Sequence, residues 1–265
     1  MAQNKSYYRP DIEGLRGLAV CMVVFYHLFP EFFPNGFLGV DIFFVISGYV
    51  VTQALERNLN KGLVAGLITF YSSRAKRILP ALFVMLTVTA LMCALFIPPT
   101  ELSSILKTGG AAALGLSNVA LSYARFDYFN LSLALNPFLH TWSLGVEQQY
   151  YLLFPALFLA TKFFPKNRLT NLTFLLLITF LSFGLWLYLS QTSPIQSFYN
   201  PLGRFWEFLC GCLMHLTRNS VSRKITSNQV NGLQFLAFLM FVAANIVSVS
   251  DYVVAPIANI LAVFS

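Results

Sequence analysis

Charged residues are scarce in this chain. Only 10% of its 265 residues are Asp, Glu, Lys or Arg, whereas 57% are hydrophobic. A soluble domain carries about 25% charged residues, so the composition excludes an ordinary soluble enzyme and indicates a membrane protein. The net charge of +7 would suggest nucleic acid as the partner of a soluble chain. Here the basic residues fall between apolar runs, so they indicate membrane topology, and no nucleic-acid partner is predicted.

Cysteine is rare, and its placement argues against a disulfide framework or a metal site. All four cysteines lie inside apolar runs, and Cys210 and Cys212 lack the two-residue gap of a zinc site. We expect them to be packing residues. A cleavable signal peptide, an internal repeat and a low-complexity tract are not found either.

Apolar runs of about the 20 residues needed to cross a bilayer are abundant. They predict an all-α, polytopic helical membrane protein with about eight spans. The predicted spans are 15–33, 37–55, 79–97, 141–161, 171–190, 200–217 and 230–248, with another that begins near 252.

Basic residues predict which gaps between the spans are cytoplasmic. The gaps at 56–78, 162–168 and 218–224 contain Lys and Arg, whereas those at 30–36 and 191–201 contain neither. By the positive-inside rule the first set is cytoplasmic, as is the N-terminus, and the second set is external. An even number of spans must then lie between residues 78 and 162. The moderately apolar stretch 104–122 is therefore predicted to be external or re-entrant.

Five ionisable residues lie in the outer halves of four predicted spans. Ionisable groups inside a membrane are costly and usually functional. The five are His27, Asp41, Glu147, Arg204 and Glu207. Their similar depth predicts one buried polar layer. Arg204 and Glu207 are three residues apart on one helix face, so a structural ion pair and an acceptor site are both open for them.

Arginines mark the cytoplasmic side of the same spans. Arg16 and His27 are eleven residues apart, which on a helix is about 16.5 Å and about 20° past three turns, so both share a face. Arg74 and Arg77 share a face if their segment is helical. A plain positive-inside anchor and a phosphate clamp both remain open for this pair, since guanidinium groups bind phosphate oxygens with two hydrogen bonds.

Together these segments resemble the acyltransferase-3 family of bacterial integral-membrane acyltransferases. The resemblance rests on "YRPDIEGLRGLAV" followed by a histidine, "GFLGVDIFFVISGYVVT", "FYSSRAKRILPAL", "LHTWSLGVEQQYYLLFP" and "GRFWEFLCGCL". It implies functional roles for Arg16 with His27, for the Arg-x-x-Arg pair Arg74 and Arg77, and for Glu147.

In sequence, these segments are similar to the branch of the family that O-acetylates cell-surface polysaccharides such as lipopolysaccharide O-antigen. Peptidoglycan is the alternative acceptor. The resemblance implies a multi-pass protein of the bacterial cytoplasmic membrane with ten spans, often followed by an SGNH-hydrolase-like domain. Residues 1–265 are therefore expected to be a membrane domain truncated at its C-terminus, without a soluble domain. One departure is Gln148, where the family often has a second carboxylate.

The resemblance also implies a reaction. Acetyl-CoA, or another acyl-CoA, would donate from the cytoplasm to a glycan hydroxyl outside. Donor phosphates would be held by Arg16, Arg74 and Arg77. His27 would act as a general base or carry the acyl group, and Asp41 or Glu147 would hold its tautomer. No metal is required, because a thioester needs only a base and oxyanion donors. A transporter or flippase of a glycan or acyl group is the alternative.

Overall fold

The computed structural model describes residues 9–123, 136–161 and 168–222. Every regular element within these ranges is a helix, which confirms the predicted all-α class. The predicted spans at 230–248 and beyond 252 lie outside the described residues, as does most of the basic gap at 162–168.

The chain divides into two compact units. The first unit comprises residues 1–47 and 217–265, and the second comprises residues 48–216. Helix α2 (Gly39–Leu59) begins in the first unit and continues in the second.

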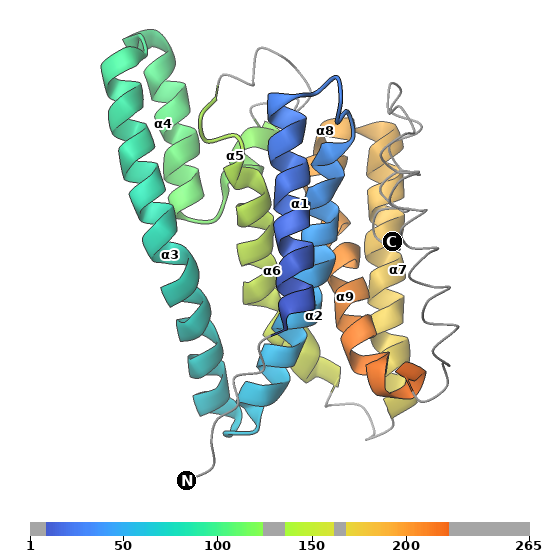
Figure 1. The fold of residues 1–265 in the computed structure, drawn as a ribbon. Coiled ribbons are helices and arrows are strands. Elements are labelled where there is room, and N and C mark those ends of the chain that lie inside the picture. Colours follow the sequence, from blue (N-terminus) through green and yellow to red (C-terminus); the bar gives the residue numbers. More distant parts are fainter. Residues whose placement is uncertain (1–8, 124–135, 162–167, 223–265) are drawn as a thin grey trace. The chain divides into compact units, whose positions relative to one another are not determined.

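The first unit is built on a close approach between two helices. Helix α1 (Pro10–Leu28) is followed by the short 3-10 helix η1 (Gly36–Leu38) and then by α2 (Figure 1). A Cβ atom on Gly36 would collide with the backbone oxygen of Met22, and one on Gly39 with that of Ala19. Because only glycine leaves this space, the start of α2 packs directly on the backbone of α1.

The start of α1 is stabilised by its own charges. Pro10 occupies the first turn, where its missing N–H sacrifices no helical hydrogen bond. Arg9 Nη2 lies 2.6 Å from Asp11 Oδ2, and the hydrogen bonds that Arg9 donates lower the pKa of Asp11 to about 2. Asp11 therefore stays ionised at neutral pH, at the helix end where the dipole favours negative charge.

The second unit holds the rest of α2 and the helices that follow it (Figure 1). These are α3 (Leu63–Phe96), α4 (Pro99–Ala113), α5 (Ser117–Tyr123), α6 (Thr141–Ala160), α7 (Arg168–Thr192), α8 (Pro194–Tyr199) and α9 (Pro201–Ser222), the last of which extends into the first unit.

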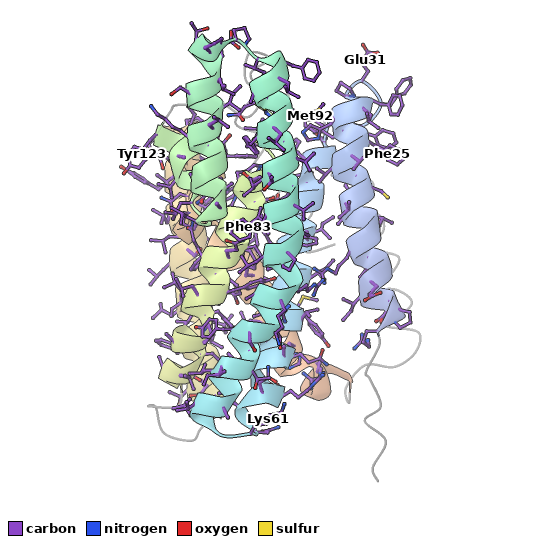
Figure 2. The ribbon with its side chains drawn as sticks, turned by 90° about the vertical axis from the view of Figure 1, so that its left-hand side faces the viewer. Phe25, Glu31, Lys61, Phe83, Met92 and Tyr123 are labelled. Carbon is purple, nitrogen blue, oxygen red and sulfur yellow. The ribbon has the colours of Figure 1, made fainter. Side chains whose placement is uncertain are left out.

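Helix α3 is longer than the predicted span 79–97. It begins at Leu63 and runs for 34 residues, through Pro80. At 1.5 Å per residue it is about 50 Å long, against about 30 Å for the bilayer core. The Arg-x-x-Arg segment is thus helical and continuous with the span. Figure 2 shows α3 along its length, with Phe83 and Met92 among its exposed apolar side chains.

The stretch 104–122 forms two helices. Helices α4 and α5 are joined by a turn at Gly115, whose φ of 71° favours glycine. The apolar side of α4 has a partner, because Ile105 and Ala112 pack in one cluster with Leu86 of α3. That burial explains why this moderately apolar stretch is helical. Its external or re-entrant position relative to the bilayer stays a prediction.

Three helices of the described residues are long and apolar enough to cross a membrane by length and composition: Gly36–Leu59, Leu63–Phe96 and Leu169–Thr192. Helices α6 and α9 have 20 and 22 residues but carry buried charged side chains. The findings thus support a multi-pass membrane protein, while the number of about eight spans stays a prediction.

The topology can be tested with single cysteines in a Cys21→Ser background. Lys61 lies in the turn between α2 and α3, and Gln191 lies near the far end of α7 (Figure 2). A membrane-impermeant maleimide added from outside should label Gln191→Cys and spare Lys61→Cys until the membrane is permeabilised. Labelling of Lys61→Cys in sealed cells would overturn the predicted orientation.

Candidate functional site

His27 lies one residue before the end of α1, nearer the helix end than the predicted span 15–33 implied. Its ring is exposed, and Nδ1 lies 2.8 Å from the backbone oxygen of Val23. A carbonyl oxygen only accepts, so Nδ1 carries the proton, and in the neutral ring Nε2 carries the lone pair. The Val23 carbonyl is therefore sufficient to fix the tautomer of His27. Sequence analysis had given this role to Asp41 or Glu147.

Asp41 and Arg16 complete the candidate residues of the first unit. Asp41 is in the first turn of α2 and is only 1% exposed. Gly39, two residues before Asp41, packs on Ala19 of α1, which lies eight residues before His27. Arg16 lies further back on α1, where its guanidinium is 4.9 Å from the centre of the Phe43 ring.

In the second unit, Tyr151 contacts two of the predicted residues. Its hydroxyl donates a hydrogen bond to Glu147, one turn earlier on α6. The guanidinium of Arg74, on α3, lies 5.4 Å from the centre of the same tyrosine ring. A predicted donor-binding residue and a predicted catalytic carboxylate therefore share one neighbour. Sequence analysis missed Tyr151, although its four-residue spacing from Glu147 places both on one helix face.

The helices that carry Arg74 and Glu147 are joined beside this contact. The hydroxyl of Tyr71 on α3 donates to the backbone oxygen of Leu152 on α6, over 3.1 Å. Arg74 is half-buried in this seam, whereas Arg77 is exposed one turn further along α3. The two arginines share a face, as predicted, and differ in burial. Arg77 is therefore accessible to a ligand in solution.

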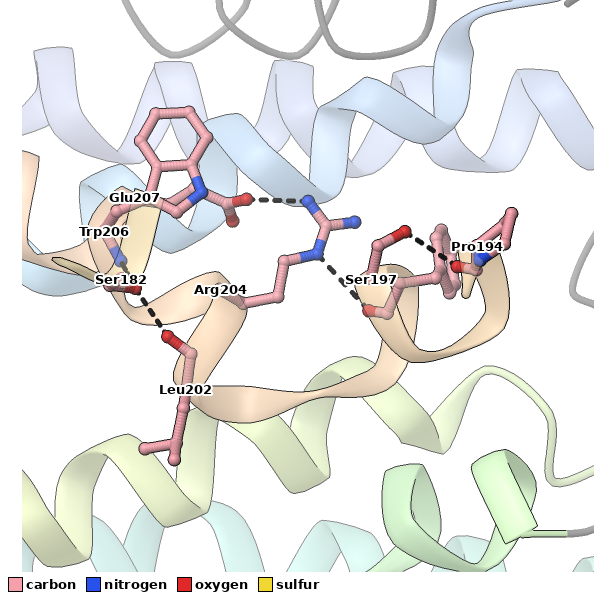
Figure 3. A network of polar contacts seen from close by, with 8 residues as sticks. Ser182, Pro194, Ser197, Leu202, Arg204, Trp206 and Glu207 are labelled. Atoms are coloured by element: carbon pink, nitrogen blue, oxygen red, sulfur yellow. Dashed lines mark hydrogen bonds and ion pairs between the residues drawn. The ribbon is translucent and has the colours of Figure 1, made fainter. Parts of the chain in front are cut away.

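Arg204 and Glu207 form a buried ion pair. Arg204 Nη1 lies 2.6 Å from Glu207 Oε1, and the two side chains are 2% and 0% exposed. Arg204 Nε also donates to the backbone oxygen of Phe198 over 3.3 Å, as Figure 3 shows. Its guanidinium lies 5.4 Å from the Phe198 ring centre and 5.9 Å from that of Trp142. These contacts compensate for removing both charges from water.

Ser182 of α7 holds the start of α9 next to this pair. Its hydroxyl accepts from the backbone N–H of Trp206 over 2.9 Å and donates to the backbone oxygen of Leu202 over 2.5 Å (Figure 3). Both backbone groups belong to the first turns of α9, and Arg204 lies between these two residues in the sequence. The pair is thus held by α7 as well as by the aromatic rings.

Helices α6 and α9 lie side by side. Trp142 at the start of α6 contacts Arg204, and one face of Tyr150 stacks on Phe208 with ring centres 4.3 Å apart. Glu147 lies between these two points along α6. Within the second unit the structure therefore brings Glu147 and the Arg204–Glu207 pair onto neighbouring helices. A shared layer with His27 and Asp41 of the first unit stays a prediction.

Sequence analysis missed a pair of one histidine and one glutamate that joins α9 to α2. His215 Nε2 of α9 lies 2.8 Å from Glu56 Oε2 of α2, and the ring of Tyr49 meets the imidazole edge-on. No signal in either helix alone pointed to this contact between distant segments. In the described part of the chain, no three His, Cys, Asp or Glu side chains gather as metal ligands would.

Comparison with known proteins gives a family match over almost the whole chain. Residues 9–264 match the family described as "Acyltransferase domain". The chain is 33% identical over 245 residues to the O-acetyltransferase OatA of Staphylococcus aureus (strain NCTC 8325 / PS 47). The aligned region covers 88% of this chain and 40% of that protein.

Two further relatives are similar. The peptidoglycan O-acetyltransferase OatA of Listeria monocytogenes is 32% identical over 247 residues, covering 89% of this chain and 39% of that protein. The putative peptidoglycan O-acetyltransferase YrhL of Bacillus subtilis is 29% identical over 245 residues, covering 89% and 38%. The chain thus spans about two fifths of the length of these relatives. No solved structure matches.

The buried pair gives a stability prediction. Arg204→Met should destabilise the protein by about 3–5 kcal/mol, because it leaves the Glu207 carboxylate buried without its guanidinium. The double variant Arg204→Met/Glu207→Leu should recover most of that loss. Thermal unfolding of purified protein in detergent measures both, with the exposed Lys107→Met as a control expected within about 0.5 kcal/mol of the parent. A double variant as unstable as Arg204→Met would contradict the ion-pair explanation.

Proposed function

Because the chain belongs to the acyltransferase-3 family, we propose that it is a membrane O-acyltransferase that transfers an acetyl group to a hydroxyl of a cell-surface glycan. The observation that carries the proposal is the family match over residues 9–264. The relatives are named O-acetyltransferases, and two of the three described above are named for peptidoglycan. Peptidoglycan is therefore the favoured acceptor, ahead of the lipopolysaccharide O-antigen that the sequence resemblance had suggested.

The donor is proposed to be cytoplasmic acetyl-CoA, whose phosphates bind arginine. Arg77 is exposed on α3, and Arg74 lies one turn earlier against the Tyr151 ring. A guanidinium on an aromatic ring keeps its positive charge, and its planar donors match phosphate oxygens. The predicted role of Arg16 in donor binding stays a prediction.

His27 is proposed to handle the acyl transfer through Nε2. In the direct route, Nε2 takes the proton of the acceptor hydroxyl while that oxygen attacks the thioester carbonyl. The C–S bond then breaks, and the imidazolium returns the proton to the CoA thiolate. In the covalent route, Nε2 attacks the carbonyl first, the C–S bond breaks, and CoA leaves as the thiolate. The glycan hydroxyl then attacks the acetyl-imidazolium and gives its proton to the thiolate, and the C–N bond breaks to restore neutral His27. The buried Asp41 of the neighbouring helix α2 would stabilise the imidazolium.

Glu147 is proposed to position the donor site. It accepts the hydrogen bond of Tyr151, whose ring lies against Arg74. This contact favours a role for Glu147 in holding the ring, and through it the arginine, over direct contact with His27. Glu147 is then a positioning residue, and its effect reaches the donor through two side chains.

The overall reaction is tested with acetyl-CoA labelled in its acetyl group. Membranes that contain the protein should transfer label to added peptidoglycan, and His27→Ala should reduce transfer by about 10²–10⁴-fold with normal accumulation of the protein. Phe32→Ala, an exposed substitution just beyond the same helix end, is the control. Label on the protein without glycan would indicate the covalent route. Movement of label across the membrane without transfer would favour a transporter instead.

The donor-site assignment predicts how Tyr151 and Arg74 depend on each other. Arg74→Ala should raise the donor KM about 10-fold or more through the loss of a charged contact. Tyr151→Phe, which loses only the bond to Glu147, should raise it about 2–10-fold. The double variant should match Arg74→Ala alone, because Tyr151 acts through the arginine.

Tyr71→Phe is the matched control for this cycle. It removes another hydroxyl that joins α3 to α6 but touches neither Arg74 nor Glu147 in the contacts described above. Its donor KM should stay near that of the parent. A fall in kcat with unchanged donor KM in Tyr151→Phe would instead place Glu147 in the chemical step.

A further inference from the structure

A groove opens between the end of α5 and the turn that joins α7 to α8. It encloses about 350 Å³ and is lined by Ser122, Tyr123, Ser193, Ile195 and Gln196. Sites for small molecules usually enclose about 300–1,000 Å³, so this groove has room for a sugar unit. Neither the predicted ion layer nor the arginine pair includes any of its residues.

The described lining of the groove is uncharged and combines polar with apolar surface. Ser122, Ser193 and Gln196 offer two hydroxyls and an amide, and no hydrogen bond of the Ser193 or Gln196 side chain occurs within the described part of the chain. Tyr123 adds an aromatic ring that is 82% exposed and projects from the end of α5 in Figure 2. Among the lining residues that the structure describes, a phosphate-bearing donor would find no cation, and an acyl chain would meet three polar side chains.

These groups suit a neutral sugar ring. Hydroxyl and amide groups both donate and accept, as sugar hydroxyls do. The C–H face of a pyranose can pack on the exposed face of Tyr123, and the side chain of Ile195 offers an apolar contact for the methyl of an N-acetyl group. Carbohydrate is therefore the ligand class that the lining matches.

The position of the groove fits an acceptor outside the cell. It lies at the end of α7 opposite the basic gap before Arg168, and α7 is one of the candidate spans. The gap 191–201 that forms one wall contains no Lys or Arg. By the positive-inside rule this end of α7 is the outer one.

The groove stands on a rigid base. Below it, Asn118 Nδ2 donates to the backbone oxygen of Tyr199 over 3.0 Å, and Gln149 Nε2 donates to Asn118 Oδ1 over 2.8 Å. Both Asn118 and Tyr199 are buried, so α5, α6 and α8 are tied together under the groove. Gln196 is also only two residues from Phe198, whose backbone oxygen Arg204 holds. Such a pre-organised site loses little entropy on binding.

We propose that this groove is the acceptor site of the transferase and holds neutral sugar rings of the glycan strand. The proposal rests on the proposed function and specifies where its acceptor binds. It predicts that the groove residues affect the acceptor and leave the donor unaffected.

The kinetic test compares KM values for the two substrates. Tyr123→Ala and Gln196→Ala should each raise the KM for soluble peptidoglycan fragments about fivefold to tenfold, as the loss of one contact implies, with the acetyl-CoA KM unchanged. Tyr188→Ala removes another exposed tyrosine, on α7 and outside the groove, and should change neither KM. If the parent transfers acetyl groups and both groove variants keep its acceptor KM, the groove is not the acceptor site.

A binding test does not depend on transfer. In a Cys21→Ser background, chitotetraose, a neutral N-acetyl sugar oligomer, should slow maleimide labelling of Gln196→Cys at least about threefold, and it should leave Tyr188→Cys unchanged. Coenzyme A should protect neither cysteine. Protection without any transfer by the parent would refute the proposed function and keep the sugar site. Labelling of Gln196→Cys that chitotetraose does not slow would refute the sugar site.

Discussion

A charge surrounded by apolar groups has to be held by partners from the protein, and this constraint organises the described helices. Arg204 and Glu207 are almost completely buried and are held by each other, by the Phe198 backbone and by aromatic rings. Helices α6, α8 and α9 must pack closely for those contacts to exist at once. The cost of an unpartnered charge in this environment therefore specifies the packing as well as the local pair.

Aromatic rings are the common partner of the arginines. Arg16 lies near Phe43, Arg74 near Tyr151, and Arg204 near Trp142. A ring holds a guanidinium in place without cancelling its charge, whereas a carboxylate cancels it. Arg204 also has the Glu207 carboxylate as a partner, which suits a structural role for this arginine.

The proposed donor and acceptor sites of the second unit use different chemistry. The arginine pair of α3 is charged, and the groove between α5 and α8 is neutral and rich in hydroxyl groups. An enzyme that joins a cytoplasmic thioester to an outer glycan needs this separation, because each ligand is then rejected by the other's site. Tyr151 and Glu147 of α6, and Asn118 of α5, are the buried groups that hold the respective sites in shape.

The sequence by itself determined the helical membrane class, the family and the helix faces that charged residues share. It also predicted the burial of Asp41, Glu147, Arg204 and Glu207, whereas His27, predicted in the same buried layer, is exposed. Those properties follow from composition and from the 3.6-residue period, which act along one segment. Tertiary structure alone decided the partners: Tyr151 for Arg74, the joining of Asn118 to Tyr199 across 81 residues, and the packing that made 104–122 helical. Periodicity reports which face of a helix is apolar, whereas a contact depends on which distant segment packs against that face, and no single segment encodes that choice.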